Sequence, residues 1–202
     1  EVDAQLVQGN FPIPDYPISA KVAALIEAEN RFETDWLCLL DADTILTKEL
    51  HIHEESDTGL VPVFVGAQPW GEAPQKEWQS LYDHFGFEYT QYRVKSLLDN
   101  IIMEPYFNAG MVLTQDTQFG SKWKDVMVEL AKLDLKSSRY IDQIALSLVA
   151  TQNRLAVMPD GYNFPVFLRI IAPSDSRVLH YRDPRWFLRL PQYDGLLEEL
   201  GV

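Results

Sequence analysis

An apolar run that ends abruptly at two acids constrains the fold of this chain more than any other feature. Residues 36–40 read Trp-Leu-Cys-Leu-Leu, and Asp41 and Asp43 follow directly. A continuous apolar run of this length is typical of a strand that is buried on both faces of an α/β sheet. Ligand sites in open α/β sheets lie just past the carboxyl ends of such strands. The run therefore predicts a layered α/β protein with a functional site at its two acids.

Helical and extended patterns alternate along the rest of the chain. The apolar residues recur at helical spacing in some segments and form short continuous runs in others. This alternation predicts one α/β domain over residues 1–202, with a mixed, mostly parallel sheet flanked by helices. We expect helices over residues 19–33, 75–85, 122–133 and 140–151, and strands over residues 2–7, 36–40, 60–65, 111–114, 155–158 and 177–181.

The composition excludes several classes of protein. The 202 residues carry a net charge of −13, which repels phosphate backbones and anionic lipids, so we expect no nucleic-acid partner. No apolar run approaches the roughly 20 residues that a membrane-spanning helix needs. The single cysteine, Cys38, excludes a disulfide framework, and its place in the apolar run predicts a buried, inert thiol. These features are compatible with a cytoplasmic protein, which is our expectation.

Asp41 and Asp43 have the chemistry of a divalent metal site. Two carboxylates two residues apart can converge on one hard cation, and Mg²⁺ and Mn²⁺ prefer oxygen ligands. Such an ion neutralises the charge that develops on a diphosphate leaving group. Asp-x-Asp is a common pattern, however, and the alternative is that both acids only cap a turn.

His180 and Lys21 are two further candidates. His180 ends an expected strand, and neutral imidazole is a ligand for Mn²⁺; the alternative is an ordinary hydrogen-bonded histidine. Lys21 falls in the first turn of an expected helix, where a cation opposes the helix dipole, so a compensating anion is expected nearby. The alternative for Lys21 is a solvated surface side chain.

Two polar segments complete the set of candidates. Asn108-Ala109-Gly110 places an amide, a small residue and a glycine before an expected strand, which suits close contact with sugar hydroxyls or an ordinary turn. Asp142 and Gln143 lie near the start of an amphipathic helix, where an acid also complements the helix dipole.

These segments, taken in order, resemble the core of GT-A-type nucleotide-diphospho-sugar transferases. They are most similar to family 8 glycosyltransferases of the glycogenin and lipopolysaccharide-galactosyltransferase type. The similarity covers about residues 21–186. Beyond Lys21, it rests on the residues 39–44 Leu-Leu-Asp-Ala-Asp-Thr, the Phe-Asn-Ala-Gly segment 107–110, the Asp-Gln pair 142–143, the Pro-x-x-Tyr-Asn loop 159–163 and the Leu-His-Tyr segment 179–181.

The resemblance implies a function and a role for each residue. It implies transfer of a sugar, with retention of its anomeric configuration, from a nucleotide-diphosphate donor such as a UDP-sugar to a carbohydrate or glycoconjugate acceptor. The implied roles are Mn²⁺ or Mg²⁺ binding by Asp41, Asp43 and His180, donor binding by Lys21, Asp41, Asn108, Ala109 and Gly110, and catalysis beside the donor sugar by Asp142 and Gln143.

The chain departs from the family pattern at two places. Only 40 residues precede Asp41, where family members place about two βα units that hold the nucleotide base, so we expect part of that region to be missing. After His180, the usual Gly and Lys before Pro-Trp are absent. Arg182 or Arg185 is expected to supply the positive charge for the leaving diphosphate.

Two alternative functions remain open. A haloacid-dehalogenase-like phosphatase also places Asp-x-Asp and Thr after a buried strand, but its second aspartate is followed by Gly-Thr or a near variant, whereas Thr44-Ile45 follows here. The other alternative is a non-catalytic sugar- or nucleotide-binding remnant, because a fold does not fix a function.

Overall fold

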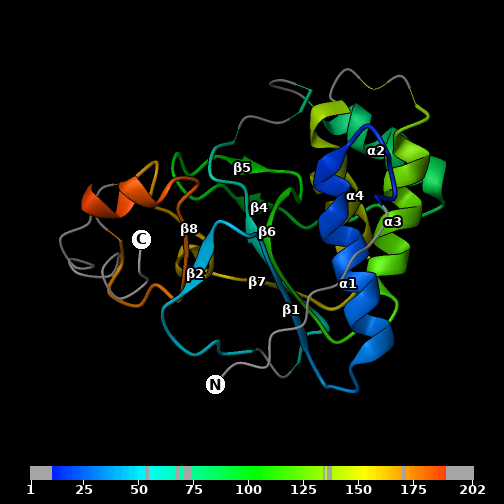
Figure 1. Ribbon diagram of the computed structural model, residues 1–202. Helices are drawn as coiled ribbons and strands as arrows, with labels where there is room; N and C mark the ends of the chain where they lie inside the picture. Colours follow the sequence, from blue (N-terminus) through cyan, green and yellow to red (C-terminus); the bar gives the residue numbers. More distant parts are fainter. Residues whose placement is uncertain are drawn as a thin grey trace.

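The computed structural model describes residues 11–52, 55–66, 69–70, 74–133, 135, 138–169 and 172–189. Within these residues the chain forms a mixed α/β structure (Figure 1), as expected, and the expected strand at residues 2–7 lies outside them. The strands are β1 (Leu37–Leu40), β2 (Thr44–Leu46), β3 (Thr58–Pro62), β4 (Val94–Lys95), β5 (Ile102–Met103), β6 (Phe107–Thr114), β7 (Leu155–Val157), β8 (Phe164–Pro165) and β9 (Val178–His180).

The larger sheet has the strand order β1-β6-β3-β7. Strand β6 pairs antiparallel with both β1 and β3, and β3 pairs parallel with β7. Strands β1, β3 and β7 therefore run in one direction, and β6 runs against them between β1 and β3. A smaller sheet has the order β2-β9-β8, and β4 and β5 form a hairpin. The mixed sheet expected from the sequence is thus confirmed, with one reversed strand inside it.

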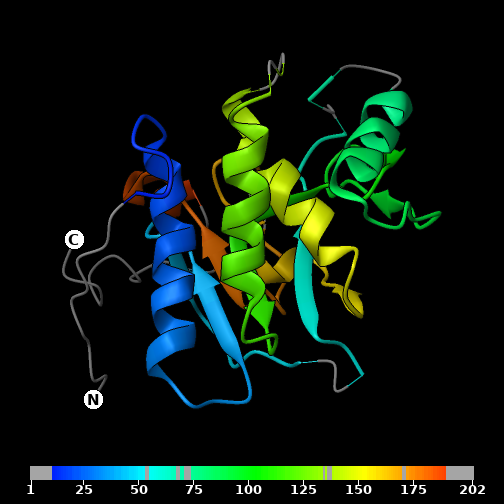
Figure 2. The same cartoon turned by 90° about the vertical axis from the view of Figure 1, so that its right-hand side faces the viewer.

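In the described part of the chain, four α-helices lie together beside the larger sheet (Figures 1 and 2). Their apolar spacing explains the packing: Phe119, Trp123 and Met127 recur at intervals of four along one helix and are fully buried. Burial of side chains this large contributes about 1.5–3 kcal/mol each. The helices are α1 (Ala20–Arg31), α2 (Gln75–Phe85), α3 (Phe119–Leu130) and α4 (Ile141–Ala150), with short 3₁₀ turns η1 (Pro17–Ser19), η2 (Ser138–Tyr140), η3 (Asp160–Tyr162) and η4 (Pro184–Arg189).

The other face of the larger sheet carries a second, smaller core. Val61 and Met111 of the sheet pack there with Met158, Tyr162 and Val178. This core joins the larger sheet to β9 and η3. It therefore holds the small sheet in place, and the candidate metal ligands lie where the two sheets meet.

Strand β1 and its cysteine differ from the sequence-based expectation. We expected a strand buried on both faces with an inert, buried thiol, but Leu37, Leu39 and Leu40 are only half-buried and Cys38 is exposed. The physical reason is position: among the described residues β1 pairs with β6 alone and lies at the end of the sheet. An apolar run can form such an edge strand as well as a central one.

Candidate metal and donor site

The turn that links the two sheets fixes Asp41 and Asp43. Asp41 follows β1 directly, and its N–H donates to the Gly110 carbonyl at 3.0 Å. The Thr44 hydroxyl donates to the Asp41 carbonyl at 2.7 Å, which closes the turn. The Asp43 carbonyl accepts from the Tyr181 N–H at 2.9 Å, which ties this turn to the residue after β9. Both carboxylates are therefore held by backbone contacts from two sheets.

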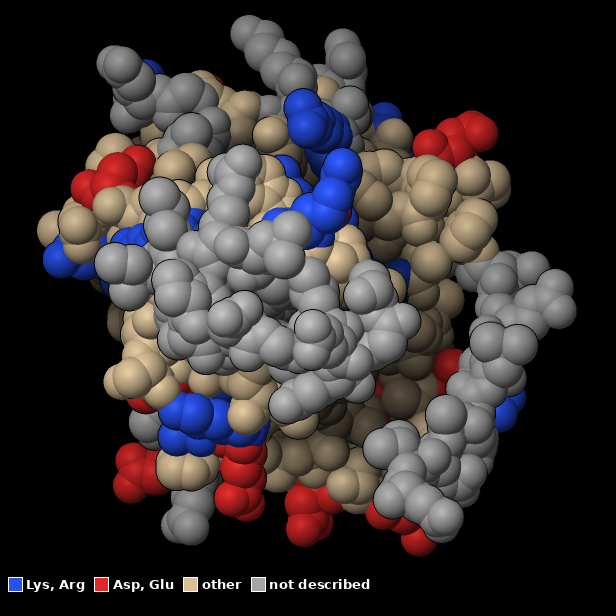
Figure 3. Space-filling view, turned by 60° about the vertical axis from the view of Figure 1, so that its left-hand side comes forward, with Lys and Arg blue, Asp and Glu red and all other residues tan. Residues whose placement is uncertain are grey.

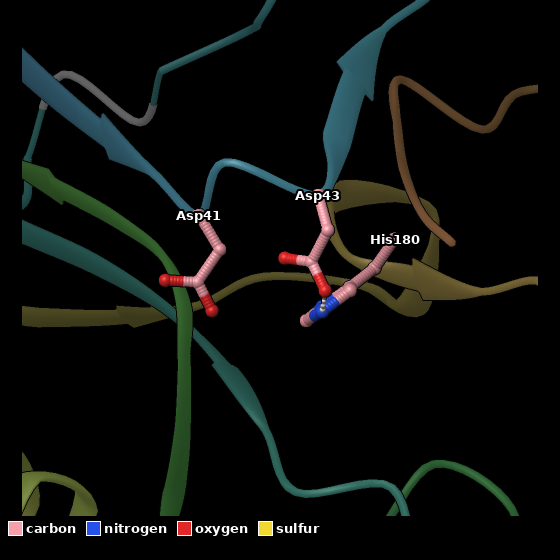
Figure 4. A group of neighbouring side chains, drawn as sticks. All are labelled: Asp41, Asp43 and His180. Atoms are coloured by element: carbon pink, nitrogen blue, oxygen red, sulfur yellow. Dashed lines mark hydrogen bonds and ion pairs between the residues drawn. The ribbon is translucent and has the colours of Figure 1, made fainter. Parts of the chain in front are cut away.

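His180 completes a cluster with these two acids. It ends β9, paired in register with Thr44. Its Nε2 lies 3.2 Å from Oδ2 of Asp43, and one possible ligand atom from each of Asp41, Asp43 and His180 lies within 4.8 Å of the others. Figure 4 shows the three side chains directed to the same side of the turn. Metal–ligand bonds of about 2.0–2.3 Å fit ligand atoms at this spacing.

A chain of hydrogen bonds determines which nitrogen of His180 carries its proton. Asn108 Oδ1 accepts from the Gly110 N–H at 2.7 Å, so the atom of Asn163 that faces it at 2.7 Å is the amide nitrogen. The amide oxygen of Asn163 therefore faces His180 Nδ1, at 3.0 Å. Nδ1 must donate this hydrogen bond, and in the neutral ring Nε2 then keeps a free lone pair.

The surroundings of His180 favour that neutral ring. The side chain is buried, and this burial lowers the pKa of the imidazole below its usual value, although the Asp43 and Asp41 carboxylates oppose the shift. Phe64 and Phe167 lie edge-on to the ring, at centroid distances of 6.2 and 5.7 Å. A neutral Nε2 and a carboxyl oxygen of Asp43 are both electron-pair donors, and a cation between them is the chemical match for this pair. The residues present thus fit a divalent ion.

Lys21 links this cluster to the buried start of α4. Its Nζ lies 2.6 Å from Asp41 Oδ1, 3.3 Å from the Ala109 carbonyl and 4.0 Å from Asp142 Oδ2. We expected a compensating anion near this ammonium. In the structure Asp41 and Asp142 supply it.

Asp142 is held in a buried polar pocket. Its carboxyl accepts a hydrogen bond of 2.7 Å from the Tyr16 hydroxyl, and its carbonyl accepts one of 2.9 Å from the Trp123 indole. Burial raises the pKa of this carboxyl, and the positive charge of Lys21 partly opposes the rise. The next residue, Gln143, is half-buried, and its carbonyl accepts from the Ser147 hydroxyl.

The Asn108-Ala109-Gly110 segment does not precede a strand, as we expected, but lies within β6, and the alternative of an ordinary turn is also wrong. Leu60 of β3 pairs with Val112, and the next residue, Val61, pairs with Asn108. Residues 109–111 therefore bulge out of the ladder on that side. Bulges of this kind are common beside active sites because they redirect side chains.

The two candidate arginines lie in different settings. Arg182 is exposed, has a φ of 59°, and places its guanidinium 4.0 Å from the centre of the Phe167 ring, beside His180. Arg185 is exposed and pairs with Asp183. In the view of Figure 3, acidic side chains (red) are most numerous along the lower margin, and basic ones (blue) lie above them and in the upper part.

Three residues of this site received no role from the sequence. Asn163 lies in the Pro-x-x-Tyr-Asn loop, so that motif was the available signal. No local pattern singled out Phe167 or Tyr16, because both act through contacts with residues distant in the sequence.

Among solved structures, the chain is similar to the galactosyltransferase LgtC, determined with donor and acceptor sugar analogs, at 15% identity and a TM-score of 0.46, over 88% of this chain and 70% of that one. It is also similar to the glycosyltransferase GlyE of Streptococcus pneumoniae TIGR4, at 17% identity and a TM-score of 0.47, over 87% of this chain and 44% of that one. No curated protein sequence matches significantly. No helix in the described part of the chain is long and apolar enough to cross a membrane.

A protein-family model gives the assignment. The model for the Rhodobacterales glycosyltransferase domain matches residues 4–154, which include Lys21, Asp41, Asp43, Asn108 and Asp142. His180 and both candidate arginines follow the matched region. The match covers well over half of the chain, and the chain therefore belongs to the Rhodobacterales glycosyltransferase domain family.

Proposed function

We propose that this chain is a metal-dependent glycosyltransferase that moves a sugar from a nucleotide-diphosphate sugar, such as a UDP-sugar, to a carbohydrate or glycoconjugate acceptor. The observation that carries the proposal is the convergence of Asp41, Asp43 and His180, whose ligand atoms lie within 4.8 Å of one another. Membership of a glycosyltransferase family supports the class of reaction.

The metal in this proposal is Mn²⁺ or Mg²⁺, held by Asp41, Asp43 and His180. When bound, such an ion supplies positive charge that stabilises a departing diphosphate. A mixed set of two carboxylates and one imidazole is more typical of Mn²⁺ than of Mg²⁺, which prefers oxygen ligands alone. Asn163 is not a ligand in this proposal but orients one, because its hydrogen bond fixes the ring of His180 with the Nε2 lone pair toward Asp43.

The donor is bound, in this proposal, by residues on both sides of the metal ligands. Lys21, Asp41 and the Asn108-Ala109-Gly110 bulge lie together on one side, where Lys21 contacts both Asp41 and the Ala109 carbonyl. Arg182, which is exposed beside His180, and Arg185 supply positive charge to the diphosphate on the other side.

Asp142 and Gln143 act beside the donor sugar. The buried Asp142 is connected to the metal ligands through Lys21, which lies 2.6 Å from Asp41 and 4.0 Å from Asp142. In the retaining reaction that we propose, the departing diphosphate takes the proton of the acceptor hydroxyl. This route needs no side chain as a general base.

A donor screen tests the proposal directly. The 202-residue chain is incubated with Mn²⁺ and each of a set of UDP- and GDP-sugars, and release of the nucleoside diphosphate is measured with and without mixed acceptors. We expect release with at least one donor, loss of release on chelation, and loss in the Asp43→Asn variant. Phosphate release from simple phosphoesters without a sugar donor would instead indicate a phosphatase, and donor binding without turnover would indicate a binding remnant.

A further inference from the structure

A polar hollow lies at the edge of the larger sheet opposite the metal-ligand cluster. It has a volume of about 590 Å³, and its walls come from residues 88–91 after α2, residues 151–154 after α4, and Asp57 before β3. Asp57 and Arg154 immediately precede the starts of β3 and β7, whereas Asp41 follows the end of β1. Because β1, β3 and β7 run in one direction, the hollow and the cluster lie at opposite edges of the sheet.

The side chains of this hollow suit a neutral polyhydroxylated ligand. Gln91 and Asn153 supply amides, which both donate and accept hydrogen bonds as sugar hydroxyls require. Thr90 adds a hydroxyl, and Tyr89 adds aromatic surface for the apolar C–H groups of a sugar. A volume of this size falls in the usual range of small-ligand sites.

The charges of the hollow argue against an anionic ligand. The carboxylate of Asp57 is neutralised by Arg154, whose Nε donates to it at 2.9 Å, and Glu88 adds a further negative charge. Helix α4 ends at this hollow, and the C-terminal end of a helix carries partial negative charge. A nucleotide diphosphate or a sugar phosphate is therefore disfavoured here.

Part of the wall is held rigidly before any ligand binds. The Tyr89 hydroxyl donates to the buried Glu104 carboxylate at 3.0 Å, and Arg93 pairs with the same carboxylate oxygen at 2.9 Å. Gln152 bonds to both the N–H and the carbonyl of Glu88, so the two walls are tied together. Preorganisation of this kind lowers the entropy cost of binding.

A second hollow extends the first. It has a volume of about 360 Å³ and shares Arg154 with it, and residues 55–56 and 155–157 form the rest of its lining. The two hollows meet at Arg154, at the starts of β3 and β7, and together are called the groove here.

We propose that this groove, defined by the residues of the two hollows, is a binding site for a neutral oligosaccharide, separate from the site of sugar transfer. Binding there requires neither a metal ion nor a nucleotide, since no residue of the groove belongs to the metal-ligand cluster. The site would hold a glycan chain at a distance from the reacting end.

Isothermal titration of the full chain with defined neutral oligosaccharides tests this site. The probes are lactose, maltotriose, cellotriose and chitotriose, titrated at millimolar concentration in EDTA without nucleotide. We expect at least one to bind. The Glu88→Ala/Gln91→Ala double variant removes a lining carboxylate, which can accept from a sugar hydroxyl, and a lining amide, so we expect it to bind roughly tenfold more weakly. Both side chains are exposed, so their truncation leaves the core intact.

The matched control is Asn30→Ala, which removes an exposed amide from α1. This variant should bind the oligosaccharide as the parent chain does. The proposal is overturned if none of the four probes binds, if the double variant binds as tightly as the parent, or if adding UDP with Mn²⁺ displaces the oligosaccharide. Failure of the donor screen alone would leave this titration unchanged, so the two proposals fail separately.

Discussion

The amide oxygen of Asn163 lies 3.0 Å from Nδ1 of His180, on the side of the ring away from Asp43. Asn163 is fully buried, and its amide nitrogen is held 2.7 Å from Asn108 Oδ1. The imidazole that faces the two carboxylates is thus oriented by a residue that does not itself reach them.

Replacing Asn163 tests that orientation. The Asn163→Ala substitution removes the acceptor for Nδ1–H, so the ring is free to turn or to change tautomer. We expect the affinity for Mn²⁺ to fall about 10–100-fold, as is usual when a residue that orients a ligand is lost. Titration calorimetry measures the change, with Asn30→Ala as control. An unchanged affinity would show that Asn163 does not set the ring.

Gly110 is the second residue on which the cluster depends. A Cβ atom at this position would lie 2.8 Å from Asn108 Oδ1, 2.9 Å from Asn163 Nδ2 and 2.9 Å from His180 Nδ1. The Gly110→Ala variant must therefore displace these polar side chains, at a cost of about 1–3 kcal/mol in the free energy of unfolding. We also expect this variant to bind Mn²⁺ more weakly. Urea unfolding measures the loss of stability, and titration calorimetry on the same samples measures the affinity for Mn²⁺.

Gly86 provides the matched glycine control. It ends α2 with a φ of 64°, and no atom lies within 4 Å of a Cβ built there. The Gly86→Ala variant should lose about 1 kcal/mol through backbone strain alone and bind Mn²⁺ normally. If both variants lost metal affinity equally, general destabilisation would explain the effect at Gly110.

The burial of Asp142 predicts a dependence of stability on pH. Its pKa is raised in the folded chain, chiefly by burial, and returns to about 3.9 on unfolding. The folded state therefore holds this proton more tightly, so its contribution to stability is present below about pH 4 and is lost as the pH rises through the raised pKa. The free energy of unfolding of the Asp142→Asn variant, relative to that of the parent, should therefore increase as the pH rises from about 4 to about 7.

Urea unfolding of both proteins at the two pH values measures this difference. The control is Asp125→Asn, because the Asp125 side chain is 73% exposed on α3. A gain for Asp142→Asn of the same size at both pH values would contradict the linkage.

The same Asp142→Asn variant separates catalysis from metal binding. If Asp142 acts at the donor sugar, the rate of sugar transfer should fall by more than about tenfold, because a positioned carboxylate is lost. The affinity for Mn²⁺ should stay within about twofold of that of the parent. Initial rates and calorimetry on one preparation give both values. Parallel loss of the two would instead place Asp142 among the residues that hold the ion.

The stereochemistry of the product tests the proposed reaction. We expect the anomeric configuration of the donor to be retained, because the departing diphosphate takes the acceptor proton on the face that it leaves. Proton NMR of the anomeric centre of the product decides the matter. A β-linked product from an α-linked donor would show inversion and would require a general base among the acids of the site.

The sequence predicted the parts of this structure that depend on local patterns. The helix expected over residues 75–85 has those bounds in the structure, because its apolar spacing is clear and Gly86 ends it in the left-handed conformation. The convergence of Asp41, Asp43 and His180 was also predicted. Each of these residues lies at or next to the end of a strand, and strand ends that meet bring such residues together.

The features that the sequence did not predict depend on contacts between residues that are far apart in the sequence. The exposure of Cys38 follows from which strands lie beside β1, and the bulge at Asn108 follows from how β3 pairs with β6. The hydrogen bond from Asn163 to Asn108 joins residues 55 positions apart. No periodicity within a short window encodes such relationships.

The bulge in β6 has a consequence for how this segment can change in length. Asp41 leaves the larger sheet where its N–H meets the Gly110 carbonyl, one step beyond the pairing of Leu40 with Met111. Pairing with β1 fixes residues 111–114, and pairing with Val61 fixes Asn108, so the segment between them has a set length. An inserted or deleted residue between Asn108 and Met111 would shift Asn108 by one position, and side chains along a strand alternate between its two faces. The Asn108 amide would then turn away from Asn163, so the arrangement of the site depends on the number of residues in this segment as well as on their side chains.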